Sequence, residues 1–147
     1  MAVKIVHGNL LDADVDIIGH QVNCRGVMGA GIALQLRQKY SGLFDHYKEY
    51  LATTPRPLGT VSLHVEKGKP IVANIYGQDG YGRDKRYTDY DALESALWEL
   101  AYIANTHGMT VALPYGIGCG LAGGNWSIVL PMIEDIFQNV DCYIYKL

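Results

Sequence analysis

The chain has 147 residues, of which 49% are hydrophobic and 18% charged, and this balance predicts one globular domain, residues 1–147, and excludes a disordered chain. A formal net charge of -3 gives no general attraction to nucleic acid. No apolar run reaches the roughly 18 residues that span a bilayer, so no membrane partner is expected. Three cysteines, none of them in a Cys-x-x-Cys motif, favour a reducing, cytoplasmic setting.

Six short runs of β-branched and aromatic residues, bounded by Gly, Pro, Asp or Lys, predict strands. They are Val3–His7, Asp16–Val22, Thr60–Val65, Ile71–Ile75, Thr110–Leu113 and Cys142–Tyr145. Strands interleaved with helices, several of them apolar on both faces, predict an α/β fold with a mixed sheet between helical layers.

Apolar residues at helical spacing predict three helical regions between these strands. They run from near Ala30 to about Leu51 with a break at Ser41-Gly42, from Asp89 to His107, and from about Trp126 to Gln138. We expect Thr88 to cap the second region and Gly108 to end it. In the third region we expect a kink at Pro131. Its inward face is expected to consist of Ile128, Met132, Ile133, Ile136 and Phe137.

Two glycine-rich loops follow predicted strands and carry most of the chemistry in the sequence. The first glycine loop runs from Asn23 to Ile32 and the second from Pro114 to Gly124, each before a predicted helix. Glycine lets a backbone approach a ligand closely, and the N-terminus of a helix offers unpaired N–H groups to an anion. Two such loops can hold the two phosphates of a pyrophosphate, whereas one loop alone is better explained as a tight turn.

Other phosphate and metal sites fit the sequence less well. The stretch Gly29-Ala30-Gly31-Ile32-Ala33-Leu34 begins like the dinucleotide motif, but Leu34 replaces its third glycine and the acidic residue about 20 positions later is missing. Neither loop is followed by the Gly-Lys-Ser/Thr of a P-loop. The cysteines and histidines lack metal-ligand spacing and the carboxylates do not cluster, so no metal and no cofactor is expected.

Over nearly its whole length the sequence resembles a macrodomain, a module that binds ADP-ribose. His7-Gly8-Asn9-Leu10-Leu11 is similar to the opening Gly-Asp-Ile/Leu motif of the family. Ile17–Cys24 with Gly29–Ala33 resembles its first binding loop, and Pro114–Leu121 resembles its second.

One branch of the family matches most closely through His20, Asn23-Cys24 and Met28–Ala33. That branch contains ADP-ribose 1''-phosphate phosphatases, terminal ADP-ribose–protein glycohydrolases and DNA-directed antitoxin macrodomains. The resemblance implies a three-layer α/β/α macrodomain with a mixed central sheet of about six strands.

The resemblance also implies a set of ligand-binding residues at strand ends. They are Asn9, Leu10, Met28, Gly29, Ala30, Gly31, Ile32, Tyr115, Gly116, Ile117, Gly118, Cys119, Gly120, Leu121 and Tyr145. Asn9 stands where the family has an aspartate that accepts from the adenine amino group, and its amide oxygen can still accept one hydrogen bond. Tyr145 is expected either to stack near the adenine or to be an ordinary inward residue of the last strand.

His20 and Asn23 are the catalytic candidates that the resemblance implies. Asn23 matches an asparagine near the distal ribose, and His20 matches a phosphatase histidine that can act as a general acid or base. Without the resemblance, His20 is better explained as a core histidine bonded to a carbonyl. The glycohydrolase branch has a lysine and an aspartate where this chain has Gly77 and Ala122, so both groups of its covalent route are absent.

The segment Asp79–Tyr87 carries two acids, three bases and two tyrosines, after the strand that borders the distal ribose in the family. It is either a solvated loop or a contact to a terminal phosphate through Arg83, Lys85 or Arg86.

Our first hypothesis is therefore a metal-independent phosphatase that hydrolyses the terminal phosphate of ADP-ribose 1''-phosphate to ADP-ribose and phosphate. The alternatives are a glycohydrolase acting on ADP-ribosylated protein or nucleic acid, and a non-catalytic ADP-ribose-binding module. The expected partner is ADP-ribose or its 1''-phosphate, with nucleic acid only as an ADP-ribosylated substrate.

Overall fold

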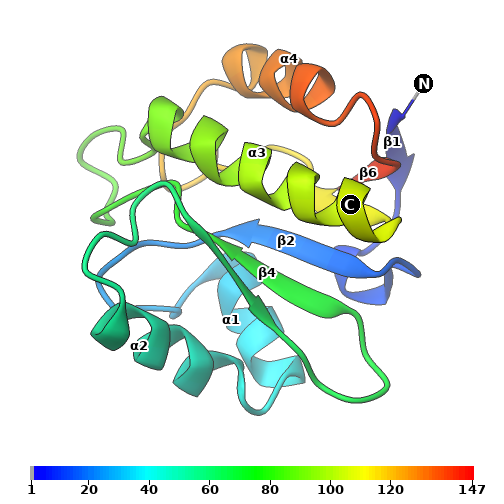
Figure 1. Cartoon of the computed structure of the whole chain (residues 1–147). Helices are drawn as coiled ribbons and strands as arrows, with labels where there is room; N and C mark the ends of the chain where they lie inside the picture. Colours follow the sequence, from blue (N-terminus) through cyan, green and yellow to red (C-terminus); the bar gives the residue numbers. More distant parts are fainter. Residues whose placement is uncertain (1) are drawn as a thin grey trace.

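The computed structural model describes residues 2–147 as a six-stranded sheet between two layers of helices (Figure 1). The strands are β1 (Val3–His7), β2 (Ile17–Gln21), β3 (Val61–His64), β4 (Ile71–Ile75), β5 (Val111–Pro114) and β6 (Cys142–Lys146). The helices are α1 (Gly31–Lys39), α2 (Leu43–Thr53), α3 (Tyr90–His107) and α4 (Trp126–Ile136), with a 3-10 turn η1 (Leu10–Asp12). The predicted α/β class is confirmed, and each strand end lies within one residue of its predicted position.

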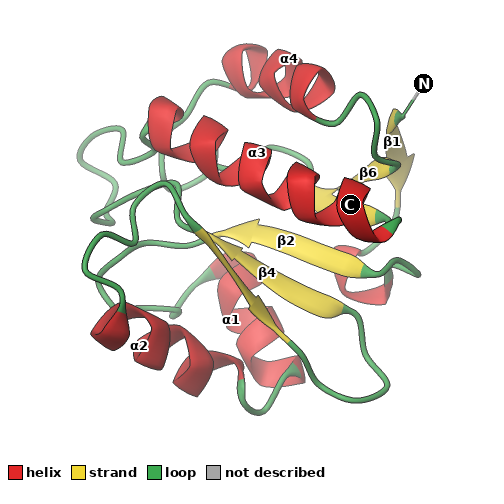
Figure 2. Cartoon of the chain, viewed as in Figure 1, coloured by secondary structure: helices red, strands yellow, loops and turns green. Residues whose placement is uncertain are grey.

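The sheet has the order β1-β6-β5-β2-β4-β3. All neighbouring strands are parallel except β3 and β4, which are antiparallel, so the sheet is mixed as predicted. Helices α3 and α4 cover one face of the sheet and α1 and α2 the other (Figure 2). Because β1, β6, β5, β2 and β4 are parallel, the loops that follow them open along one edge of the sheet.

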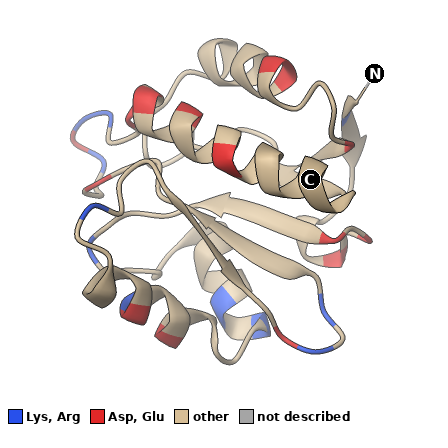
Figure 3. Cartoon of the chain, in the orientation of Figure 1, with Lys and Arg blue, Asp and Glu red and all other residues tan. Residues whose placement is uncertain are grey.

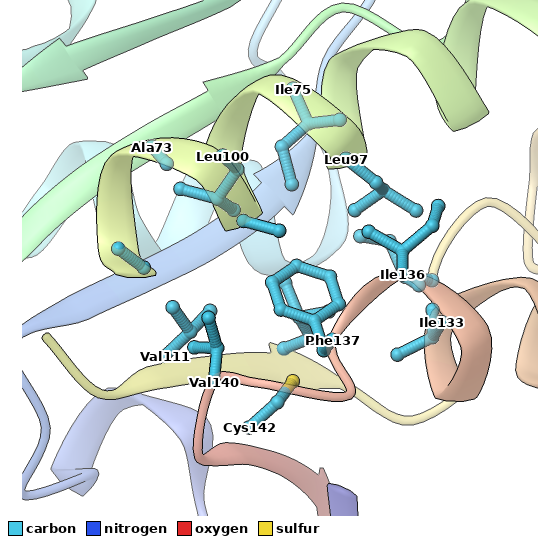
Figure 4. Close-up of a cluster of buried hydrophobic side chains, with 14 of the residues drawn as sticks. Ala73, Ile75, Leu97, Leu100, Val111, Ile133, Ile136, Phe137, Val140 and Cys142 are labelled. Atoms are coloured by element: carbon cyan, nitrogen blue, oxygen red, sulfur yellow. The ribbon is translucent and has the colours of Figure 1, made fainter. Parts of the chain in front are cut away.

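A hydrophobic core lies on each face of the sheet. Ile17 of β2 belongs to the core beneath α3 and α4, and the next residue, Ile18, belongs to the core beneath α1 and α2. Successive side chains of a strand point to opposite faces, so one strand supplies both cores. Figure 4 shows the first core, in which Leu97, Leu100 and Phe137 are fully buried.

The ends of α3 follow local capping chemistry. The prediction that Thr88 caps this helix is wrong, because the Asp89 carboxylate accepts from the Ala92 N–H at 3.0 Å instead. The Thr88 hydroxyl donates to the Gly118 carbonyl, in the second glycine loop. Gly108 ends the helix in the left-handed conformation, with φ of 63°, as predicted.

The inward face of α4 is confirmed at Ile133, Ile136 and Phe137, which are buried, but the prediction is wrong at Ile128. Ile128 is 44% exposed, whereas Val129 and Ile133 are fully buried. The helix begins at Trp126 with Asn125 as its N-cap, and its buried stripe runs at spacings of four and three residues from Val129 to Ile136. Pro131 lies inside this helix.

The break expected at Ser41-Gly42 is confirmed, because α1 ends at Lys39 and α2 begins at Leu43. Within residues 2–147, none of the helices is long and apolar enough to cross a membrane.

Candidate functional site

The two glycine loops start side by side at one edge of the sheet. The first follows β2 and leads into α1, and the second follows β5 and leads towards α4. Because β2 and β5 are adjacent and parallel, their carboxyl ends bring the starts of the two loops together. This edge is where ligands bind in open α/β sheets.

The first glycine loop ends in an open helix N-terminus. Ala30 is the N-cap of α1, and its side chain makes no capping hydrogen bond. Gly31 has a φ of 55°, in the left-handed region, and a Cβ there would meet nothing within 4 Å. Gly29 to Gly31 are exposed and Ile32 is half-buried, whereas Met28 is buried in the core and offers a ligand only its backbone. Free N–H groups facing open space suit an anion.

The second glycine loop contains open glycines and packed glycines. A Cβ at Gly116 or Gly120 would meet nothing within 4 Å, whereas one at Gly118 would lie 3.0 Å from Oε1 of Gln21. Side-chain exposure also varies among the expected contacts: Tyr115 and Leu121 are exposed, Cys119 is half-buried, and Ile117 is buried.

The residues expected near the adenine lie at the β1 and β6 side of the same edge. The side-chain oxygen of Asn9 accepts from the Leu11 N–H at 3.0 Å and caps η1, so one of its lone pairs is already used. Leu10 is buried, and its side chain therefore packs inward. Tyr145 is half-buried, and Gly8 lies against its ring, since a Cβ on Gly8 would meet the ring at 3.5 Å.

His20 lies inside the protein. Its ring is fully buried, and its Nε2 lies 2.7 Å from Oδ1 of Asn74, to which it donates. Burial lowers the pKa of His20 to about 4, while the Asn74 hydrogen bond opposes that shift in part. A general base needs access to water or substrate, so this geometry matches the core-histidine interpretation, with a side-chain amide as the partner.

The Asn23 side chain is used within the first glycine loop. Its Nδ2 donates to the Val27 carbonyl at 2.9 Å, and its Oδ1 accepts from the Arg25 N–H at 2.9 Å. The hydroxyl of Tyr47 lies 2.7 Å from this Oδ1 and accepts from the Gly26 N–H at 3.1 Å. Asn23 therefore shapes the loop from within. Sequence reasoning missed Tyr47, because an aromatic residue within a predicted helix gives no local signal of a contact to a distant loop.

A polar junction joins the end of β2 to the second glycine loop. Gln21 Nε2 donates to Gln78 Oε1 at 2.8 Å and to Thr88 Oγ1 at 2.9 Å, and the Thr88 hydroxyl donates to the Gly118 carbonyl at 2.6 Å. A Cβ at Gly77 would lie 2.3 Å from Oε1 of Gln21. Gln21 thus fills the space beside Gly77.

A family model described as the Macro domain matches residues 20–133 of the chain. The chain belongs to the macro domain family. This macrodomain is 28% identical over 144 residues to a DNA ADP-ribosyl glycohydrolase of Mycobacterium tuberculosis, with 94% of the chain and 40% of the relative covered. It is 28% identical over 145 residues to the human ADP-ribose glycohydrolase OARD1, with 97% of the chain and 88% of the relative covered. The chain spans about 40% of the length of the first curated relatives.

Solved structures give the same family. The macrodomain of Mycobacterium tuberculosis DarG superposes with a TM-score of 0.85 at 27% identity, with 99% of this chain and 97% of that chain covered. A Bacteroides thetaiotaomicron protein of unknown function superposes with a TM-score of 0.89 at 29% identity, with 100% and 99% covered. The three-layer α/β/α macrodomain architecture expected from the sequence is therefore confirmed.

In this macrodomain the β4–α3 loop (residues 76–89) is attached to both glycine loops. The Asp79 carbonyl accepts from the Cys24 N–H at 2.9 Å, and the Asp79 carboxylate pairs with Arg25 at 2.9 Å. At its other end the N–H groups of Tyr87 and Thr88 donate to the Ala122 carbonyl at 2.8 and 3.1 Å. Figure 3 shows basic positions along this loop.

A cavity of about 250 Å³ lies beneath the β4–α3 loop. It is lined by Arg25, Leu58, Asp79, Gly80, Lys85, Arg86, Tyr87 and Asp89. Among residues 2–147, no group of three or more His, Cys, Asp or Glu side chains is placed to hold a metal ion.

Proposed function

We propose that this macrodomain binds ADP-ribose along the edge of the sheet where the two glycine loops start. The observation that carries the proposal is the pair of loops on the adjacent parallel strands β2 and β5, one of which opens the uncapped N-terminus of α1. Open space at Gly31 and Gly116 leaves room for a pyrophosphate to approach the backbone N–H groups. In this arrangement Asn9 and Tyr145 face the adenine side, and the β4–α3 loop faces the distal ribose.

The reaction we propose is hydrolysis of the phosphomonoester of ADP-ribose 1''-phosphate. A water oxygen attacks phosphorus, the bond from phosphorus to the ribose oxygen breaks, and that oxygen leaves with a proton as the hydroxyl of ADP-ribose. Phosphoryl transfer depends mainly on positioning and on stabilising charge, and Lys85 and Arg86 supply positive charge at the distal side. The glycine at 77 and the alanine at 122 support this reaction over one that needs a lysine and an aspartate there.

His20 and Asn23 act as positioning residues in this proposal. Both side chains are engaged inside the protein, with Asn74 and with the first glycine loop respectively. We propose that they hold the end of β2 and the loop that follows it, and that neither touches the phosphate.

A glycohydrolase is the second candidate, because the two curated relatives described above are named as glycohydrolases. In that reaction a water would attack the anomeric carbon, and ADP-ribose would leave protein or nucleic acid. The relative named ADP-ribose glycohydrolase OARD1 is matched over 88% of its length, which is the observation that favours this candidate.

Calorimetric titration with ADP-ribose and a phosphate-release assay test the proposal together. We expect binding, and release of phosphate from ADP-ribose 1''-phosphate in the presence of EDTA. Release of ADP-ribose from ADP-ribosylated protein or DNA without phosphatase turnover would replace the first candidate by the second. If the protein bound ADP-ribose but catalysed neither reaction, it would be a non-catalytic binding module. If it did not bind ADP-ribose, the proposed binding site would be wrong.

A further inference from the structure

We propose that the cavity beneath the β4–α3 loop is a subsite for a phosphate group carried on the distal ribose, formed by Lys85 and Arg86. The inference rests on the proposed function, because it requires ADP-ribose to lie along the sheet edge. It goes further by naming the two side chains that distinguish ADP-ribose bearing a terminal phosphate from ADP-ribose itself.

The position of the cavity follows from the strand order. Along the carboxyl edge, the adenine-side residues lie at β1 and β6, the glycine loops at β5 and β2, and the β4–α3 loop one strand further on. A ligand whose pyrophosphate lies between the glycine loops, and whose adenine lies towards β6, extends its other end towards β4. The cavity is therefore on the side of the distal ribose.

Two of the three cations in the cavity lack an acidic partner. Arg25 is paired with Asp79 at 2.9 Å, and the Asp89 carboxylate caps α3 through the Ala92 N–H. Within the described part of the chain, neither Lys85 nor Arg86 forms an ion pair. The cavity therefore holds two cations that a phosphate can engage through charge-assisted hydrogen bonds.

Aromatic rings hold these two cations near the cavity. The Arg86 guanidinium lies 4.4 Å from the centroid of the Tyr90 ring, and Nζ of Lys85 lies 5.2 Å from that of Tyr87. A cation over a ring face is attracted to it but keeps its N–H donors, which lowers the entropy cost of meeting an anion.

The backbone beneath Arg86 is fixed as well. A Cβ at Gly123 would lie 3.2 Å from the Cα of Arg86, so the second glycine loop packs directly against this residue. The next two N–H groups, of Tyr87 and Thr88, donate to Ala122. A cavity of about 250 Å³ has room for a compact group such as a phosphomonoester.

The test compares two ligands by calorimetry on the whole chain: ADP-ribose, and ADP-ribose with a non-hydrolysable phosphonate at C1''. We expect the parent to bind the phosphonate about tenfold or more tightly than ADP-ribose. Replacing Lys85 and Arg86 together by Ala should remove this preference and leave the affinity for ADP-ribose within about twofold. Arg83→Ala is the matched control, because Arg83 is an exposed cation of the same loop outside the cavity lining, and it should keep the preference. The Lys85→Gln/Arg86→Gln pair repeats the test if the alanine pair fails to fold.

The results separate failure of the proposed ADP-ribose site from failure of the phosphate subsite alone. No binding of ADP-ribose by the parent would overturn the proposed function. ADP-ribose binding without a phosphonate preference, or a preference that survives in the double variant, would overturn only the subsite. If an oligonucleotide that carries ADP-ribose bound more tightly than ADP-ribose while the phosphonate did not, the assignment of the subsite to a phosphomonoester would be overturned.

Discussion

The two glycine loops look alike in sequence, but the first holds only glycines with room for a side chain, whereas the second also holds glycines that are tightly packed. In the first loop, a Cβ at Gly31 would meet nothing within 4 Å and one at Gly29 would meet only Val27 at 3.9 Å. The loop is supported from the protein side by Asn23 and Tyr47. In the second loop, a Cβ at Gly124 would lie 2.5 Å from the Gly118 carbonyl oxygen, so that glycine is needed for packing within the loop itself. The number of glycines in a loop therefore does not show which of them leave space for a ligand and which are required by close packing of the protein's own backbone.

Gly31→Glu should have the largest effect, and the effect should fall on binding. The substitution places bulk and a negative charge where the pyrophosphate is proposed to lie, so ADP-ribose affinity should fall by more than about 100-fold. Stability should fall by only about 1–2 kcal/mol, because the left-handed φ at this position is strained for any other residue. Calorimetry and thermal unfolding on one preparation measure both quantities. Gly31→Ala is the control, because it shares the backbone strain but adds no charge. If Gly31→Glu bound ADP-ribose as tightly as the parent, the first loop would be a structural turn and not a phosphate site.

Gly124→Ala should show the reverse pattern in the second loop. The added Cβ meets backbone at 2.5 Å, so we expect the free energy of unfolding to fall by about 2–3 kcal/mol. Gly120→Ala is the control within the same loop, because its Cβ would meet nothing within 4 Å, and it should change stability by less than about 0.5 kcal/mol. Equal unfolding free energies for the two variants, measured in urea, would remove the distinction between open and packed glycines.

Acid should lower the free energy of unfolding because it protonates His20, which is buried at the end of β2 before the first glycine loop. The pKa of buried His20 is lowered to about 4, below its ordinary value of 6.5, so the unfolded chain binds the proton more readily than the folded one. The His20 contribution is complete above pH 6.5 and is lost as the pH falls from 6.5 towards 4, by about 2 kcal/mol at pH 5. Urea unfolding between pH 4 and 8 should show this slope, and it should be shallower in His20→Gln. A slope identical in the two proteins would contradict the buried, neutral imidazole.

Tyr47→Phe should have the smallest effect, a loss of about 1 kcal/mol of stability and a few-fold loss of ADP-ribose affinity. The variant removes the hydroxyl that contacts Asn23 and the Gly26 N–H beneath the first loop. Tyr50→Phe is the matched control, because Tyr50 also stacks on Tyr76 but its hydroxyl contacts Thr60. It should leave the affinity unchanged, and equal affinities in the two variants would show that Tyr47 does not support the loop.

The sequence predicts the loops and strands of this fold well, because glycines and β-branched runs are local signals. It does not predict the partners of His20 and Gln21, because strand pairing brings those partners from far along the chain. His20 and Asn74 are directly opposite in the parallel β2–β4 register, which is what buries one against the other. Thr88 similarly reads as a helix cap in its local sequence, but tertiary packing directs its hydroxyl to Gly118.

The lack of space beside Gly77 also limits which substitutions this position can accept, including a change to lysine. Gln21 can make way for a side chain at position 77 only by giving up its hydrogen bonds to Gln78 and Thr88. The two positions are therefore epistatic, and the cost of Gly77→Lys depends on what already stands at position 21.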